Sequence, residues 1–384
     1  MAGMRSDTPQ SGSGGSRDDE FFQRKRPWST IKDQVLETYL KPYLTKVKGL
    51  RRPILLIDGY AGPGRFGDGS DGSPLIMCRL AESVLGGDYT AFLVNKRREE
   101  HEILQRNLAA LNLGGEIIPV NGDAQDVILA LTPILRDCTV FAYLDSFVTP
   151  DFRLVELLVS RDKAFSTEVV VNLNAQEIPR LAAMGSGAQP SRAAEKLNSR
   201  LTARLGGDYW RPVYEARDLS SEERLLEIAY RYHSNLSRFL PYTGCCPVRW
   251  KSSGRIKYFI VFCSRHPDAA ILMNNAMHRA YYQGIHEADT KGWLPGFVDD
   301  WRDYRWFVEK PPVDLRTAVL WQVKSSSCKG RKDIWVEIVK EHFMAYDEMD
   351  YNEAVRRLVK GAVLKFEDIR GTGKLNDDSI LDLA

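Results

Sequence analysis

The stretch ILLIDGYAGPGRF, residues 54–66, joins four aliphatic residues to an acid and then to a glycine-rich segment. The aliphatic run indicates a buried strand. Gly59, Gly62 and Gly64 follow within six positions. Such a segment either makes a tight turn without chemistry or forms a floor on which a ligand lies against bare backbone, since no Cβ blocks the approach. The surrounding sequence decides between these two interpretations.

Predicted strands and helices alternate around this stretch. Apolar runs predict strands at 54–58, 89–95, 116–123, 139–145, 166–174 and 257–265. Helical spacing predicts helices at 73–85, 98–111, 124–135, 151–160 and 269–282, and an earlier one from about residue 31 with Ser29 or Thr30 as its N-cap. Alternating units with continuously apolar strands predict an α/β, Rossmann-like fold with a mainly parallel sheet and helices on both faces.

The chain divides into three predicted parts. Residues 1–26 are rich in Gly and Ser and predict a disordered tail. Residues 27–311 predict the Rossmann-like domain, with a helical insertion at about 178–240 and a linker or packed loop at 284–311. Residues 312–384 predict three helices and a hairpin, which is the arrangement of a winged helix.

Composition excludes several classes of protein. The net charge is only +2, and no apolar run approaches the roughly 20 residues that a membrane span needs. The N-terminus lacks the apolar core of a secretion signal, so we expect a cytoplasmic protein without a membrane partner. The six cysteines show no paired metal-ligand spacing, and we expect free, mostly buried thiols and no metal.

The glycine segment favours a ligand without a diphosphate. Its spacing is G-x-x-G-x-G, and a long loop, GDGSDGSP, separates it from the next helix. A dinucleotide site instead places its glycines directly before a helix N-terminus. We therefore expect S-adenosylmethionine (SAM), with its amino-acid end across the glycines. Ser73 either helps to bind the ligand carboxylate or only caps its helix. The candidate residues here are Asp58, Gly59, Ala61, Gly62, Gly64 and Ser73.

The ends of the next two strands offer polar groups for the nucleoside. In parallel sheets ligands bind beyond the carboxyl ends of the strands, where an acid accepts the ribose hydroxyls. This chain has Asn95 there, whose carbonyl can accept one such bond. Asp123 is placed to accept from the adenine amino group, with the Ala124 amide beside it; equally, Asp123 caps the helix that follows.

The fourth strand ends in YLDSF, residues 143–147. We expect Asp145 to orient the methyl acceptor or take its proton, and Phe147 to stack against it. The alternative is that Asp145 caps the next helix.

The sequence resembles the three-Cys-motif partner proteins (TcmP). The resemblance rests on IDGYAGPGRFGDGSDGSPLIMC, NGDAQDVI, YLDSF and YFIVFCSRHPDAAILMNNAM, and it spans most of residues 28–384. It implies a SAM-dependent methyltransferase domain with a C-terminal winged helix, and a radical-SAM-like three-Cys-motif protein as a partner. The YAGPGR and GSP segments are also similar to those of ribosomal RNA adenine methyltransferases, which implies nucleic acid as a substrate class.

The chain departs from the family pattern at two positions. Asn95 stands where the family has Glu, and Ser146 stands where it has Pro. The motifs and the resemblance together predict a SAM-dependent methyltransferase that acts on a nitrogen or oxygen nucleophile, with a nucleic-acid base as one candidate. Two alternatives stay open: an enzyme of small-molecule biosynthesis, and a protein that binds nucleic acid or its partner without turnover.

Overall fold

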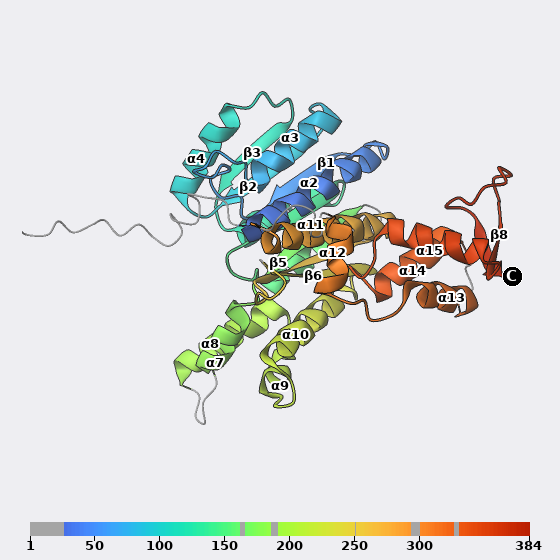
Figure 1. Cartoon of the computed structure of the whole chain (residues 1–384). Helices are drawn as coiled ribbons and strands as arrows, with labels where there is room; N and C mark the ends of the chain where they lie inside the picture. The colour runs from blue at the N-terminus through green and yellow to red at the C-terminus, as the bar shows by residue number, and fades with distance from the viewer. Residues whose placement is uncertain (1–26, 162–165, 186–190, 250, 293–299, 326–329) are drawn as a thin grey trace, which may run out of the picture.

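A seven-stranded sheet forms the centre of the molecule (Figure 1). The computed structural model describes residues 27–161, 166–185, 191–249, 251–292, 300–325 and 330–384, so the predicted tail at 1–26 lies outside the described residues. The strand order is β3-β2-β1-β4-β5-β7-β6. The strands are β1 (Ile54–Asp58), β2 (Thr90–Asn95), β3 (Glu116–Asn121), β4 (Thr139–Leu144), β5 (Thr167–Leu173), β6 (Tyr242–Val248) and β7 (Tyr258–Ser264).

The sheet is mainly parallel. Strands β1 to β5 run parallel to one another, whereas β7 pairs antiparallel with both β5 and β6. The residues of β1, β4, β5 and β7 are buried along their whole length, as their continuous apolar runs predict. The predicted Rossmann-like fold is confirmed.

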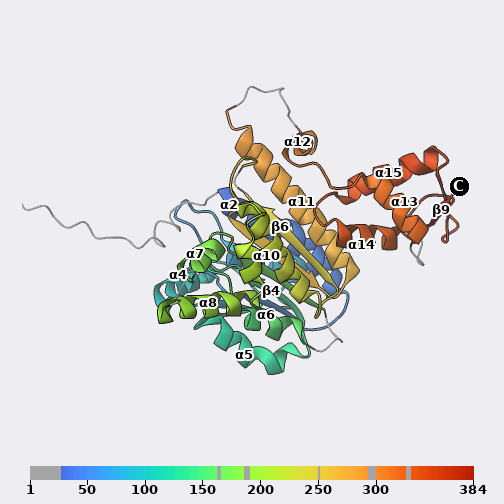
Figure 2. The same ribbon diagram turned by 90° about the horizontal axis from the view of Figure 1, so that it is seen from below.

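Helices cover both faces of the sheet (Figure 2). One apolar cluster joins the sheet to α2, α3, α4 and α11 (Pro267–Asp289), and the other joins it to α5, α6, α8 and α10. The helices up to β7 are α2 (Pro27–Lys48), α3 (Ser73–Leu85), α4 (Arg98–Ala109), α5 (Ala124–Leu135), α6 (Phe152–Val159), α7 (Glu177–Gly185), α8 (Arg192–Leu205), α9 (Trp210–Glu215) and α10 (Ser221–Leu236).

Two local predictions were wrong. Helix α2 begins at Pro27, before the expected caps Ser29 and Thr30. The segment 284–311 contains the end of α11 (Pro267–Asp289) and all of α12 (Trp301–Val308) where a linker or loop was expected. Helix α11 continues through Gly284 because it packs closely on α2: a Cβ on Gly284 would lie 2.7 Å from the Ile31 side chain.

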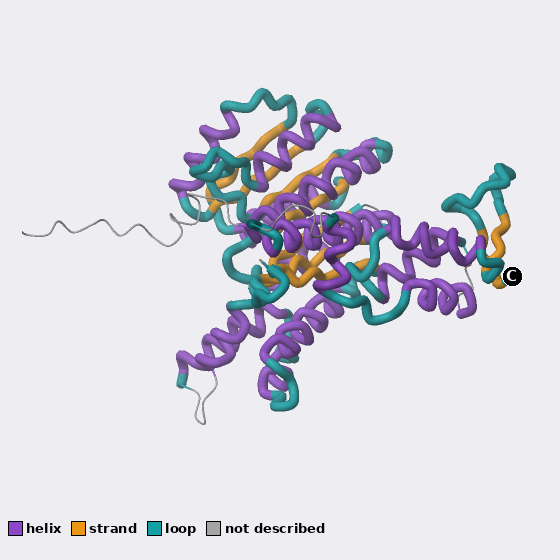
Figure 3. Tube along the Cα trace, viewed as in Figure 1, coloured by secondary structure: helices purple, strands orange, loops and turns teal. Residues whose placement is uncertain are grey.

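The C-terminal segment forms a third apolar cluster, centred on three helices. These are α13 (Leu315–Ser325), α14 (Arg331–Glu341) and α15 (Glu348–Lys360), and the hairpin of β8 (Leu364–Glu367) and β9 (Ile380–Leu383) follows them (Figure 3). Arg305 of α12 forms an ion pair with Asp350 of α15 at 2.5 Å, which ties this segment to the rest of the molecule. The winged-helix designation and the domain boundaries stay predictions.

Neither a membrane span nor a metal cluster is found in the described part of the chain. No helix there is long and apolar enough to cross a membrane. No group of three or more His, Cys, Asp or Glu side chains in the same residues could hold a metal ion.

Candidate active site

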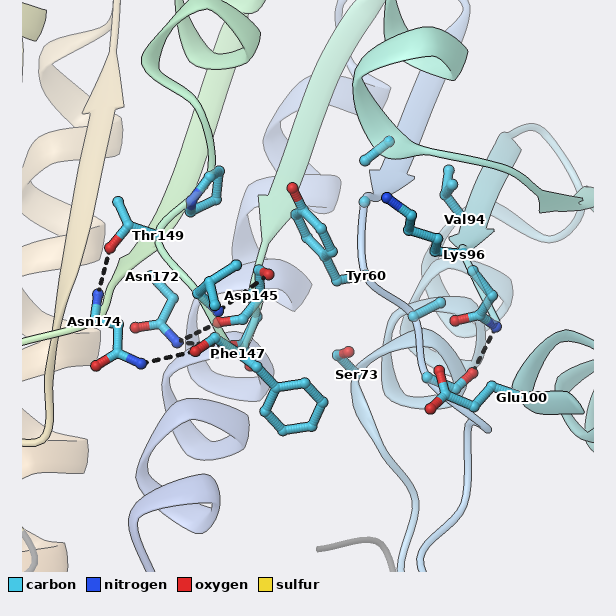
Figure 4. A pocket seen from close by; sticks show the side chains of 18 of the residues that line it. Tyr60, Ser73, Val94, Lys96, Glu100, Asp145, Phe147, Thr149, Asn172 and Asn174 are labelled. Atoms are coloured by element: carbon cyan, nitrogen blue, oxygen red, sulfur yellow. Dashed lines mark hydrogen bonds between the residues drawn. The ribbon is translucent and has the colours of Figure 1, made fainter. Parts of the chain in front are cut away.

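A cavity of about 730 Å³ opens at the carboxyl ends of β1, β2, β3 and β4 (Figure 4). It lies at the point where the strand order reverses between β1 and β4, the usual ligand position in an open α/β sheet. Its volume suits a ligand of nucleoside size. Of the eleven site residues that the sequence predicts, ten line it: Gly59, Ala61, Gly62, Gly64, Ser73, Asn95, Asp123, Ala124, Asp145 and Phe147.

The glycine loop is held by backbone hydrogen bonds to its neighbours. The Gly59 N–H donates to the Tyr143 carbonyl at 3.0 Å, and the Ala61 N–H donates to the Val94 carbonyl at 3.0 Å. Gly62 and Gly64 have φ values of 59° and 81°, a region that favours glycine. The glycines are therefore required by the loop conformation, and they also leave bare backbone at the cavity wall.

Asp58 lies behind this wall, because it is fully buried and does not line the cavity. It accepts hydrogen bonds from the Ser73 hydroxyl at 2.7 Å and the Tyr60 N–H at 3.1 Å. Burial raises the pKa of Asp58 to about 7. Asp58 thus joins the loop to the start of α3. Gly72 is the N-cap of α3, so Ser73 does not cap that helix.

Asn95 stabilises the glycine loop through a hydrogen bond. It is buried, and its Nδ2 donates to the Gly62 carbonyl at 2.7 Å. A carboxylate at this position could not donate that bond. An acid that also lines the cavity is Glu100, in the first turn of α4, whose side chain is 17% exposed. Arg97 forms an ion pair with Glu100 at 3.3 Å.

Asp123 caps α5, since its side chain accepts from the Gln125 N–H at 3.0 Å. Its second oxygen accepts from Lys96 at 2.9 Å. The hydrogen bond from Lys96 lowers the pKa of Asp123, so the group is a carboxylate at neutral pH. The capping alternative therefore holds, and Asp123 also lines the cavity.

Asp145 does not cap the next helix; Asp151 does, by accepting from the Arg153 N–H at 2.9 Å. Asp145 is instead paired with Lys32 of α2, whose ammonium lies 2.6 and 2.5 Å from its two oxygens. Asn172 of β5 donates to Asp145 Oδ1 at 2.8 Å. The carboxylate is thus neutralised by a cation from the start of the chain.

Phe147 lies on the same side of the cavity as Asp145 and is 50% exposed (Figure 4). Its carbonyl accepts from the Asn174 side chain at 2.7 Å. The Ser146 carbonyl accepts from the Asn172 side chain at 3.3 Å.

Sequence reasoning missed many of the wall residues, among them Lys32, Glu100 and Asn172. Lys32 lies one helical turn before the buried Leu36, on the apolar face of α2. A lysine on that face was the signal that could have indicated a functional side chain. Glu100 lies in the first turn of α4, beyond the end of β2, and nothing in its spacing marked it. Asn172 lies inside β5, where it interrupts an apolar run that begins after Thr167 and Glu168.

No protein-family model matches the chain, and no curated protein is similar to it in sequence. Among solved structures it is similar to an O-methyltransferase from Bacillus cereus in complex with S-adenosylhomocysteine (SAH), with 12% identity over 64% of this chain and 94% of that one and a TM-score of 0.32. It is also similar to human methyltransferase-like protein 13 in complex with SAH, with 11% identity over 71% and 96% and a TM-score of 0.32. Because these TM-scores are low, the function is inferred from the geometry of the chain itself. The TcmP resemblance stays a prediction.

Proposed function

We propose that the protein is a SAM-dependent methyltransferase and that SAM binds in the cavity at the ends of β1 to β4. The observation that carries this proposal is the glycine loop, whose bare backbone lines the cavity at the switch point of the sheet. The Gly72 N–H donates to the Gly64 carbonyl at 2.8 Å, which closes the intervening loop on itself. Helix α3 starts only after that closed loop, which favours a ligand without a diphosphate.

The two ends of the ligand would contact different walls. We expect its amino-acid end to lie along Gly59–Gly64 and near Ser73, whose hydroxyl Asp58 holds in place. Its adenine would approach Asp123, and its ribose would lie between them at the end of β2.

Glu100 is the residue we expect to bind the ribose hydroxyls. Asn95 uses one N–H of its Nδ2 on the Gly62 carbonyl, and the acceptor that it offers the ribose hydroxyls is a neutral carbonyl oxygen. The Glu100 carboxylate lies on the same wall and forms charge-assisted hydrogen bonds, which are stronger than neutral ones. In Figure 4 its side chain extends toward the cavity. Glu100 therefore replaces the acid that the end of β2 lacks.

SAM supplies an activated methyl group, so the protein contributes mainly by aligning the acceptor with it. Asp145 and Phe147, on the opposite wall from Glu100, are where we expect the acceptor to lie. The predicted nucleic-acid and three-Cys-motif partners stay predictions.

A crystal structure of the protein grown with SAH tests the proposal. We expect the homocysteine along the glycine loop, the ribose within hydrogen-bond distance of Glu100, and the sulfur facing Phe147. Density for SAH elsewhere, or a cavity that remains vacant at saturating SAH, would refute it.

A further inference from the structure

The start of α2 places two buried polar side chains on the cavity wall that packing alone does not explain. Ser29 and Asp33 both line the cavity, although they are only 4% and 8% exposed. They are four residues apart, so they lie on the same face of the helix. Polar side chains that are buried at a cavity are candidates for ligand contacts, because burial without a partner is unfavourable.

The Ser29 hydroxyl is the clearer of the two cases. It has no hydrogen-bond partner within the part of the chain that the structure describes. A hydroxyl can donate one hydrogen bond and accept others, and buried hydroxyls are rarely left unpaired in folded proteins. We therefore expect a ligand in the cavity to supply the partner that the protein does not.

Asp33 adds a carboxylate close to the glycine loop. Burial raises the pKa of Asp58, and the charges of Asp145 and Asp33 raise it further, so these three carboxyl groups lie near one another. Lys32, on the same turn of α2 as Asp33, is paired with both oxygens of Asp145. The cation of this turn is therefore already neutralised, and the corner of the cavity suits a positively charged group of a ligand.

We propose that the start of α2 binds the amino-acid end of SAM, with Asp33 accepting hydrogen bonds from its ammonium group and the Ser29 hydroxyl donating to its carboxylate. The inference rests on the proposed function and adds the residues that select a nucleoside bearing a zwitterionic amino acid. An α-amino acid carries both charges at neutral pH, and a carboxylate and a hydroxyl match them. Hydrogen bonds to charged groups are roughly twice as strong as neutral ones.

The position of α2 agrees with the contacts proposed for the glycine loop. Helix α2 packs beside α3 (Figure 1), whose first residue is Ser73. The amino-acid end of the ligand would then lie between the glycine loop and α2. Arg65, the cation at the end of that loop, forms an ion pair with Asp71 at 3.2 Å.

Calorimetric titration of two ligands tests the inference: SAH, and 5′-methylthioadenosine, which has a methyl group where SAH has its amino-acid chain. We expect the wild type to bind SAH about fiftyfold more tightly than 5′-methylthioadenosine. Asp33→Asn should weaken SAH binding about tenfold and Ser29→Ala about fivefold, because each removes a charge-assisted hydrogen bond. Neither variant should change the affinity for 5′-methylthioadenosine, because this ligand lacks the groups that would contact α2.

Glu37→Gln is the matched control, because Glu37 is an exposed acid one turn beyond Asp33 that does not line the cavity. It should bind both ligands as the wild type does. Equal affinity of the wild type for the two ligands, or unchanged SAH binding in either variant, would overturn the inference. An equal loss for both ligands in Asp33→Asn would also overturn it, since that result would show a structural role only. If the wild type binds neither ligand, the proposed function itself fails.

Discussion

Asp58 shows how a single residue of this site differs from what its position in the sequence predicts. The sequence marked it as a ligand contact, but the structure places it behind the wall with the Ser73 hydroxyl. Periodicity predicts that a residue is buried at a strand end, but not which side chain from a distant segment will contact it. The same limit applies to Asp145, whose partner Lys32 lies 113 residues earlier in the chain.

The raised pKa of Asp58 predicts a pH-dependent stability. The folded state binds this proton more tightly than the unfolded state, so this residue favours folding fully below pH about 4, and the contribution is lost as the pH rises to about 7. With a shift of about three units, the loss is on the order of 4 kcal/mol. Urea unfolding of Asp58→Asn should show a weaker decline over that pH range than the wild type does.

The exposed Asp88 provides the control, and Asp88→Asn should follow the wild-type pH dependence. If Asp58→Asn and the wild type lose stability in parallel between pH 4 and 7, then Asp58 is not the group responsible.

At the scale of elements, most of the sheet could be predicted, and the exceptions have physical reasons. Continuous apolar runs marked β1, β4 and β5, because strands covered on both faces need such sequences. Strand β6 was missed because it contains Gly244 and Pro247, two residues that are rare in strands. It forms at the sheet edge, where such residues are tolerated, with Phe343 packed over Gly244.

The glycine loop predicts different outcomes for two glycines of similar conformation. Gly64 and Gly69 have φ values of 81° and 84°, but a Cβ would lie 2.7 Å from the Leu104 side chain at Gly64 and would meet nothing within 4 Å at Gly69. Both alanine variants should lose about 1–2 kcal/mol from the left-handed conformation. Gly64→Ala should lose a further 1 kcal/mol or so through overpacking and should also bind SAH more weakly.

Chemical denaturation and SAH titration of the two variants provide the comparison. Gly69→Ala should bind SAH as the wild type does, because Gly69 does not line the cavity. Equal stability and equal SAH affinity for both variants would show that the space around Gly64 does not shape the site.

At the scale of the whole molecule, the strand order brings the site together. Residues 58–64, 95, 123 and 145 are far apart in sequence, but parallel strands place their carboxyl ends at one edge of the sheet. That rule allowed ten wall positions to be predicted. It could not supply Lys32 or Glu100, which reach the cavity from helices whose orientation depends on packing across the whole fold.

The measurement that tests the central claim most directly is calorimetric titration of SAH into the wild type, Glu100→Gln and Glu99→Gln. Glu99 is the matched control, an exposed acid in the same first turn of α4. We predict saturable binding to the wild type, affinity about tenfold weaker for Glu100→Gln, through loss of charge-assisted hydrogen bonds to the ribose, and unchanged affinity for Glu99→Gln. No binding to the wild type, or equal affinities for all three proteins, would contradict the account.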